Sequence, residues 1–191
     1  MHPPTHFLIS WAVANTAKLE RRDRTLVTVS GIVADVDGAG VVVELLTRDS
    51  ENPLMWFAEY HHELCHNLTF GIVYALFALA IARRRVVTAL MSLGVFHLHL
   101  LCDILGARGP DGSQWPIPYF APFSDSPSLA WSGQWYLHGW PNMLITGVMV
   151  ILTFYLAWKR GFSFVGIFSE KADEKFVAIL RKRFGEPRGS P

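Results

Sequence analysis

The sequence has little charge, few cysteines and no excess of charge of one sign. Asp, Glu, Lys and Arg make up 17% of its 191 residues, against about 25% in soluble domains, which argues against an ordinary soluble enzyme. A formal net charge of +1 provides no basic field for nucleic acid. Cys65 and Cys102, the two cysteines, are too few for a disulfide scaffold. The sequence also lacks a phosphate-binding glycine loop, a nucleophile elbow and a paired Cys-x-x-Cys.

Apolar residues make up 51% of the chain and gather in long, nearly uncharged runs. Residues 68–82, 86–102 and 139–158 approach, with their flanks, the roughly 20 residues that cross a bilayer. A helix starting near Thr5 and a run over residues 26–36 are shorter. We therefore predict an all-α integral membrane protein, a bundle of about five membrane-embedded helices. The alternative, a soluble helical bundle, would have to bury three nearly charge-free helices on every side.

The basic residues are distributed unevenly along the chain. Nine of the 17 Lys and Arg lie at three junctions between apolar runs, and six follow residue 160. Only Arg48 and Arg108 fall in the two long connections, residues 38–60 and 106–138. The positive-inside rule then places the junctions and the C-terminus in the cytoplasm and the long connections on the other side.

The same pattern divides the chain at residue 160. Residues 1–160 are predicted to form the membrane-embedded domain, and residues 161–191 a cytoplasmic tail. Within the tail, apolar residues at helical spacing alternate with basic ones over residues 170–184, which predicts a basic amphipathic helix on the inner leaflet. A solvated helix that packs on the bundle is the alternative.

Several of the eight histidines stand near aspartates at the ends of the apolar runs. In the predicted topology these groups converge on one end of the bundle, on the non-cytoplasmic side. Ionisable groups at membrane depth indicate function, and imidazole with carboxylate suits zinc, or manganese or iron where oxygen ligands dominate. We predict one or two divalent ions, with zinc favoured. The predicted metal ligands are His6, Asp35, Asp37, His61, His62, His66, His99 and Asp103.

Some of these groups have a simpler interpretation when taken alone. Asp35 and Asp37 could end a helix before Gly38. His99 and Asp103 share a helix face because they are four residues apart, and they could form a structural hydrogen-bonded pair. The aromatic-rich connection over residues 106–138 fits an interfacial belt or a lid over the site.

Five short motifs, in this order, resemble a known family. THFLISWA, GIVADVDG, HHELCHN, HLHLLCDILGARGPDG and WPIPYFAPFS are similar to the LexA-regulated, YdjM-type inner-membrane family, described as metal-dependent hydrolases. The likeness covers most of residues 5–124. Its pattern is matched by Thr5-His6, by Asp35 and Asp37 with Ala34 in place of a proline, by His61 and His66, and by His99 and Asp103.

The third motif departs from the family pattern. His62, Glu63, Cys65 and Asn67 replace Arg, Gly, Thr and Ser. The resemblance pairs His61 with His66 as ligands, whereas helix spacing pairs His62 with His66, and both alternatives stay open.

The resemblance implies a multi-pass hydrolase of the bacterial inner (cytoplasmic) membrane. A bound divalent ion brings the pKa of its water to about 7. We therefore predict that a metal-activated water hydrolyses an ester or phosphoester of a lipid or lipid-linked substrate, with Asp37 and His99 as catalytic residues. A metal-binding or transport membrane protein without hydrolytic activity is the alternative, and a structural or stress-response membrane protein is a third. We expect membrane lipids, and not nucleic acid, as partners. The sequence does not indicate the oligomeric state.

Overall fold

A computed structural model describes residues 1–124 and 126–187 of the chain. Within them the secondary structure is helical, and β-pairing is confined to two isolated bridges, Arg108 with Tyr136 and Ile117 with Leu129. The all-α prediction is confirmed. The elements, in chain order, are α1 (Pro3–Ala14), α2 (Arg21–Ser30), the 3-10 helix η1 (Ala34–Ala39), α3 (Gly40–Thr47), α4 (Trp56–Tyr60), α5 (Leu68–Ile81), α6 (Arg85–Gly106), α7 (Trp140–Arg160), the 3-10 helix η2 (Phe164–Ile167) and α8 (Glu170–Phe184).

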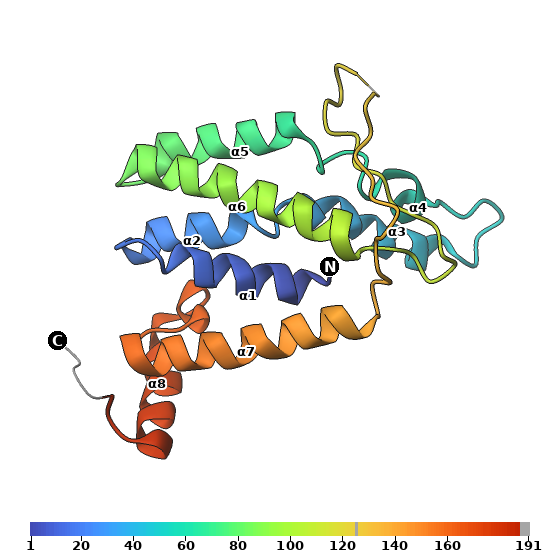
Figure 1. Ribbon diagram of the computed structural model, residues 1–191. Helices are drawn as coiled ribbons and strands as arrows, with labels where there is room; N and C mark the ends of the chain where they lie inside the picture. The colour runs from blue at the N-terminus through green and yellow to red at the C-terminus, as the bar shows by residue number, and fades with distance from the viewer. Residues whose placement is uncertain (125, 188–191) are drawn as a thin grey trace.

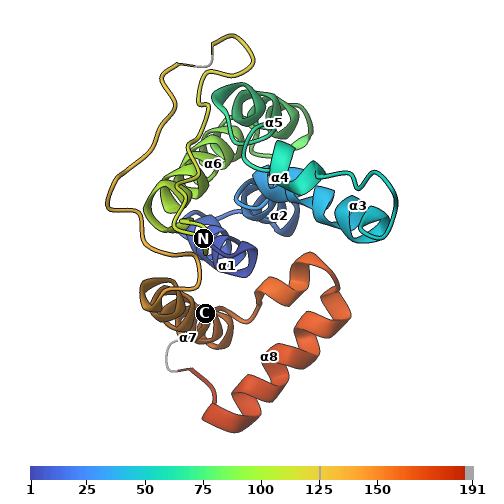
Figure 2. The same cartoon turned by 90° about the vertical axis from the view of Figure 1, so that its right-hand side faces the viewer.

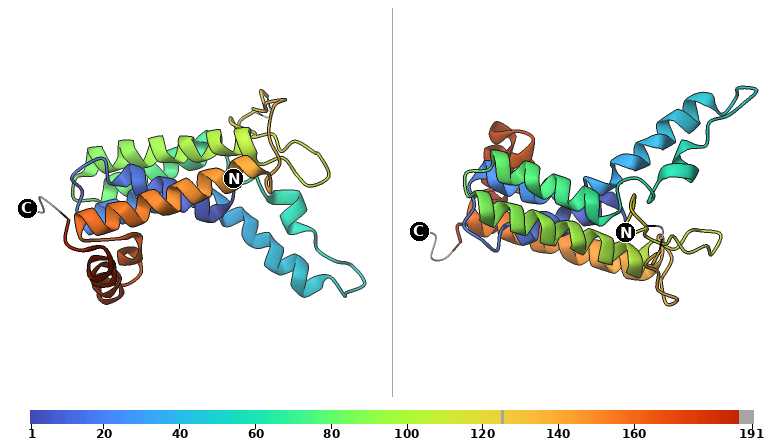
Figure 3. Two further views of the ribbon diagram at one scale, coloured as in Figure 1. Left: turned by 60° about the horizontal axis from the view of Figure 1, so that its bottom comes forward. Right: turned by 90° about the horizontal axis from the view of Figure 1, so that it is seen from above.

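Five helices, α1, α2, α5, α6 and α7, run side by side and form a bundle (Figure 1). Helix α8 lies outside the bundle, next to α7, as a view along the bundle axis shows (Figure 2). At the other end, α3 and α4 form an arm that projects away from the bundle (Figure 3). The long connection between α6 and α7 covers the same end (Figure 1).

Local sequence signals explain where the helices of the bundle begin and end. The Asn67 side chain caps α5 by accepting a hydrogen bond of 2.9 Å from the backbone nitrogen of Phe70. Helix α6 ends at Gly106, where a Cβ atom would overlap the Trp135 indole and Asn142. Helix α7 ends at Arg160, before Gly161, whose φ of 78° lies in the left-handed region. The long helices therefore end where charge, glycine or a polar cap interrupts the apolar runs.

The core of the bundle is small, and much of its apolar surface faces outward. Two clusters of buried residues fill the interior: Ala14, Leu19, Val27 and Val95 in one, and Ala34, Phe96, Leu100 and Ile117 in the other. Helix α7 exposes many large apolar side chains, among them Met143, Leu144, Val148 and Ile151. An uncharged helix with an exposed apolar face is typical of a lipid-facing segment.

Two of the described helices, α6 and α7, are long and apolar enough to cross a membrane. The number rises to three if α2 and the segment Ala34–Thr47, bent by 65° at their junction, count as one span. The prediction of about five embedded helices is not confirmed. Helices α1 and α5 have 12 and 14 residues, or about 18 and 21 Å at 1.5 Å per residue, less than the roughly 30 Å of a hydrocarbon core.

The predicted tail contains η2 and α8. Val177 and Leu180 of α8 are buried, whereas Ile179 and Phe184 are exposed. One face of the helix therefore packs on the protein, and some of its apolar side chains remain exposed. Its placement on a membrane surface stays a prediction, as does the division of the chain at residue 160. Residues 188–191 of the tail lie outside the described residues.

Candidate metal centre

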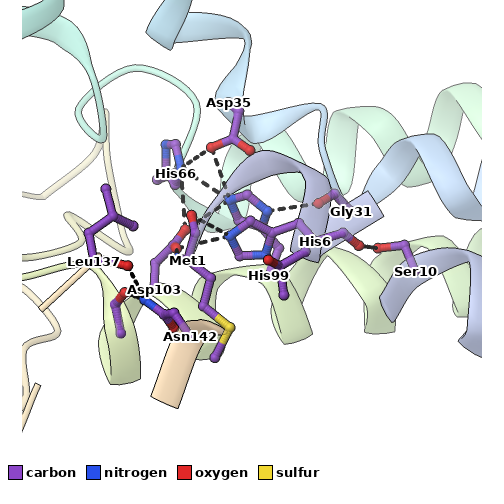
Figure 4. Close-up of polar contacts among 12 residues, drawn as sticks. Met1, His6, Ser10, Gly31, Asp35, His66, His99, Asp103, Leu137 and Asn142 are labelled. Carbon is purple, nitrogen blue, oxygen red and sulfur yellow. Dashed lines mark hydrogen bonds and ion pairs between the residues drawn. The ribbon is translucent and has the colours of Figure 1, made fainter. Parts of the chain in front are cut away.

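Four of the predicted ligands meet at one end of the bundle (Figure 4). Asp35 comes from η1, His66 from the turn before α5, and His99 with Asp103 from α6. One donor atom from each of the four lies within 4.8 Å of the other three. His66, His99 and Asp103 are buried, and the Asp35 side chain is 14% exposed. Side chains from three separate segments of the chain therefore converge on a single point, hereafter the donor group.

The spacing within the donor group suits a tetrahedral ion. The Nε2 atoms of His66 and His99 are 3.2 Å apart, and His99 Nε2 lies 3.0 Å from Asp103 Oδ2. Three further separations, from Asp35 Oδ1 to both Nε2 atoms and from Asp103 Oδ2 to His66 Nε2, are 3.7 Å each. Nitrogen and oxygen ligands about 2.0–2.2 Å from a tetrahedral zinc ion lie roughly 3.3–3.6 Å apart.

The hydrogen bonds around the donor group leave acceptor atoms facing one another. His99 Nδ1 lies 2.8 Å from the carbonyl oxygen of Gly31, and because a carbonyl only accepts, Nδ1 carries the proton and Nε2 of the neutral ring has a free lone pair. That lone pair faces Asp103 Oδ2, which is buried and has no hydrogen-bond partner among the described residues. Asp35 Oδ2 is likewise buried without a partner. A divalent cation satisfies such oxygens, so the donor group could hold a metal ion.

Asp37 lies behind the donor group and orients His66. Its Oδ2 accepts hydrogen bonds from His66 Nδ1 at 3.1 Å and from the backbone nitrogen of Cys65 at 3.1 Å. Its Oδ1 accepts one from His61 Nδ1 at 2.8 Å. A carboxylate on the far nitrogen of a metal-binding histidine fixes the ring and directs Nε2 at the ion. Asp37 therefore occupies the position of an orienting residue.

Asp103 is held from its other side by α1. Its Oδ1 contacts His6 Nε2 at 3.0 Å and also the amino group of Met1. The His6 ring packs against the His99 ring, tilted by 32°, with centroids 3.9 Å apart. On the same helix, Thr5 Oγ1 bonds to Thr146 Oγ1 of α7 at 2.6 Å. The first helix thus fixes the position of Asp103 and ties α7 to the same end of the bundle.

His61 and His62 lie beside the donor group. The His61 ring stacks on Phe57 with centroids 4.5 Å apart, and the His62 ring lies 4.2 Å from that of His66. Metal ligation by His6, Asp37, His61 or His62 stays a prediction, as do the catalytic roles of Asp37 and His99. His97 faces elsewhere, between the Leu93 carbonyl and the Tyr119 hydroxyl at 2.8 Å each.

Burial and the aspartates set the pKa values of the groups in the turn before α5. In the absence of an ion, burial opposes protonation of His66, but Asp35 and Asp37 outweigh it and raise its pKa to about 9, so a proton and a metal ion compete for its Nε2. Burial, with the neighbouring His66, lowers the pKa of His62 to about 2. Burial and then Asp37 raise the pKa of the Cys65 thiol to about 11, so this cysteine is not a thiolate at neutral pH.

Two cavities lie beside His61 and His62, and one of them reaches the donor group. One, of about 230 Å³, reaches Asp35, and the other, of about 300 Å³, reaches Glu63. Both are lined by Phe57, His61, His62 and Trp115. The donor group is therefore buried on most sides and reached by a cavity on the side of Asp35.

Sequence reasoning did not single out Gly31, Gln134 or Asn142. Asn142 Nδ2 donates to the carbonyl oxygens of Gly106 and Leu137, and its Oδ1 accepts from the Trp135 indole, so it fixes α7 against the end of α6. Gln134 donates to the Asp103 carbonyl at 2.8 Å. Asn142 could have been noticed, because it is the one amide side chain in the apolar run 139–158. Gly31 could not, because it contributes only a backbone carbonyl.

The fold and the donor group define a helical membrane protein with a buried site that could hold a metal ion. Within this class, the chain belongs to the YdjM inner membrane protein family, whose model matches residues 1–179. No curated protein and no solved structure matched the chain.

Proposed function

We propose that this chain is a membrane-bound, metal-dependent hydrolase that cleaves an ester or phosphoester of a lipid or lipid-linked substrate. Zinc is the proposed ion, because two imidazoles and two carboxylates at near-tetrahedral spacing match its preferences. Asp35, His66, His99 and Asp103 would hold it, and because a catalytic site needs one position for water, the partly exposed Asp35 would be the ligand that gives way. When bound, such an ion lowers the pKa of a water molecule to about 7 and polarises a carbonyl or phosphoryl oxygen.

One observation carries the proposal: the donor group is buried but not sealed. The Asp35 side chain is 14% exposed and lines the 230 Å³ cavity. Structural zinc sites are closed by protein ligands, whereas catalytic sites keep a side open to water or substrate. The access on the side of Asp35 therefore supports hydrolysis over a purely structural role.

The surrounding residues hold the donor group in one geometry. Asp37 fixes the ring of His66, and the Gly31 carbonyl fixes that of His99. His6 holds Asp103 Oδ1 and leaves Oδ2 directed at the shared point. Ligands whose orientation is fixed by hydrogen bonds cost little reorganisation when an ion or a substrate binds.

Transport is less well supported by the arrangement of the helices. A transported ion needs ligands along a path through the bilayer. In α5, α6 and α7, the histidines and aspartates that could serve lie at one end, and the described residues between that end and the basic junctions carry no ionisable group except tyrosine.

Turnover and metal content in matched variants test the hydrolase proposal. The full chain, purified in detergent and loaded with zinc, is assayed on a panel of neutral lipid esters and phosphodiesters. His99→Ala is expected to lose both the ion and the turnover. His97→Ala, two residues away on the same helix, is expected to keep both. Bound zinc without turnover on any ester or phosphoester would favour the metal-binding alternative.

We also propose a multi-pass topology with the N-terminus and the donor group on the non-cytoplasmic side. The support is the concentration of Lys and Arg at the junctions near residues 18–24, 83–85 and 159–160. Reporter fusions after Arg84 and after Lys159 should report cytoplasm, and a fusion near Ser113 the opposite side. A cytoplasmic signal at Ser113 would reverse the orientation.

A further inference from the structure

We propose that the cavities between His62 and Trp115 bind the uncharged acyl ester group of a lipid, and that His62 donates a hydrogen bond to it. The proposal rests on hydrolysis at the donor group, and it narrows the substrate from esters and phosphoesters in general to neutral carboxylic esters.

The position of the cavities makes them the route to the donor group. The two share Phe57, His61, His62 and Trp115, and one of them extends to Asp35. Their volumes of about 230 and 300 Å³ suit one ester group with short flanking chains rather than a whole lipid, since complete drug-sized ligands occupy roughly 300–1,000 Å³. The rest of a lipid would extend beyond them.

The charges around the cavities favour a neutral substrate. Among the described residues that line them there is no Lys or Arg, and Glu63 adds a negative charge. The amino group of Met1 also lines one of them, but it is paired with Asp103. The carboxylates of Asp35, Asp37 and Asp103 together offset that amino group and one divalent ion, so no positive charge is left over. Phosphate is normally recognised by Arg, Lys or an excess of positive charge. A carboxylic ester requires none, and the rings of Phe57 and Trp115 provide apolar contact.

His62 has the properties of a residue retained for contact with a ligand. Its φ of 73° lies in the left-handed region, which costs free energy for residues other than glycine and is concentrated at functional sites. Its ring is buried between those of His66 and Trp115, with centroids 4.2 and 4.9 Å away. The residue is 5% exposed, and its Nδ1 is buried without a hydrogen-bond partner among the described residues. Because ester oxygens only accept hydrogen bonds, a ring N–H of His62 is the matching donor.

The reaction is a simple hydrolysis. The oxygen of a water molecule bonds to the acyl carbon, and the bond from the acyl carbon to the alkoxy oxygen breaks. One proton of the water ends on the released alcohol. The other belongs to the carboxylic acid, which ionises into solvent. No further reactant is needed, and the role of His62 is to position the ester oxygen.

Three forms of the full, zinc-loaded chain test the proposal: wild type, His62→Gly and His62→Asn. Glycine relieves the left-handed backbone and removes the ring, whereas asparagine tolerates that backbone and keeps an N–H donor. The probes are p-nitrophenyl butyrate as neutral ester and bis(p-nitrophenyl) phosphate as anionic phosphodiester. Wild type should cleave the butyrate at least 100-fold more efficiently. His62→Gly should lose 10- to 100-fold in kcat/KM with unchanged zinc content and an equal or higher melting temperature, and His62→Asn should recover part of that loss.

Binding without turnover provides a second readout. N-butyl butyramide, a neutral and non-hydrolysed analogue, should raise the melting temperature of wild type and of His62→Asn but not of His62→Gly, and inorganic phosphate should raise none of them. Preferred cleavage of the phosphodiester would overturn the neutral-ester proposal and leave the hydrolase proposal standing. Unchanged butyrate turnover and amide binding in His62→Gly would overturn the role of His62. Absence of turnover on both probes, with His62-dependent amide binding retained, would instead count against hydrolysis and support the binding site.

Discussion

Each end of the helical bundle contains a buried aspartate, and the two form different hydrogen bonds. Asp23, near the start of α2, accepts hydrogen bonds from the backbone nitrogens of Arg83 and Arg84 at 2.9 and 2.7 Å, one on each oxygen. Asp103, near the end of α6, keeps Oδ2 without a hydrogen-bond partner, 3.0 Å from the acceptor nitrogen of His99. Both carboxylates are removed from water, but only the first has a hydrogen bond on each of its oxygens.

This difference separates a structural aspartate from a ligand-binding one. Asp23 joins α2 to the turn between α5 and α6, and both of its oxygens accept backbone hydrogen bonds there. Asp103 is surrounded by side chains that direct its remaining oxygen, with three other donors, at one point. A buried charge is tolerated when it is paired or coordinates a metal, and these two residues represent the two solutions within one small bundle.

Removing the ion is the change with the largest expected effect, and it acts on the Asp103 end alone. An ion that binds only the folded state stabilises it by about 4 kcal/mol at 1,000 times its Kd, or roughly 10 °C in melting temperature for a chain of this size. Chelator should lower the wild-type melting temperature by this order. His99→Ala and Asp103→Ala should melt at the same temperature with and without chelator. If chelator has no effect on the wild type and elemental analysis finds no ion, the donor group is a structural polar network.

Asp23→Ala is the matched change at the other end. It leaves two partly buried backbone N–H groups without their charged acceptor, at a cost of about 2 kcal/mol in the free energy of unfolding. Zinc content should remain that of the wild type, because Asp23 contacts none of the donors. Thermal unfolding and elemental analysis of one preparation check both statements. Loss of zinc in a variant that still folds would show that the two ends are coupled.

Much of the helical framework could be predicted, because charge interrupts apolar runs where helices end. The runs 68–82, 86–102 and 139–158 correspond to α5, α6 and α7. The run 26–36 does not form one helix: α2 ends at Ser30, and the chain turns there into η1 and α3. A Cβ atom on Gly31 would overlap the Ser10 hydroxyl and approach Val95, so the bend depends on a close tertiary contact that an apolarity profile does not reveal.

The donor group could be predicted only as a set of residues near one end of the bundle. The predicted topology places the four ligands at the same end of the bundle: Asp35, His66, His99 and Asp103. It does not show which neighbouring residues orient these ligands, because that depends on individual hydrogen bonds. Asp37 is two positions from Asp35, yet it faces His66 Nδ1 rather than the shared point. The left-handed backbone of His62 could not be predicted, since only a few per cent of residues other than glycine adopt it.

Asp37→Asn tests whether Asp37 orients His66 or binds the ion directly. The amide keeps the volume and one acceptor, but its NH₂ group meets a donor at either His61 or His66. Loss of such an orienting carboxylate weakens metal affinity by about 10- to 100-fold, or about 1.4–2.7 kcal/mol. Competition with a chromophoric chelator measures the change, with the exposed Glu63→Gln as a control expected near the wild-type value. Complete loss of the ion in Asp37→Asn would instead support Asp37 as a direct ligand.

The smallest effect is expected where carboxylates are exposed. Glu170 lies 3.2 Å from Arg21, with side chains that are 74% and 45% exposed. Solvent screens such a pair, and holding two long side chains together costs entropy, so exposed ion pairs contribute about 0.2–1 kcal/mol. Glu170→Gln should therefore change the free energy of unfolding by less than about 1 kcal/mol and leave zinc affinity untouched, as measured beside Asp23→Ala in one detergent. If Glu170→Gln lowered the free energy of unfolding as much as Asp23→Ala does, burial would not determine how much a carboxylate stabilises this bundle. The contrast between the two ends would then need another explanation.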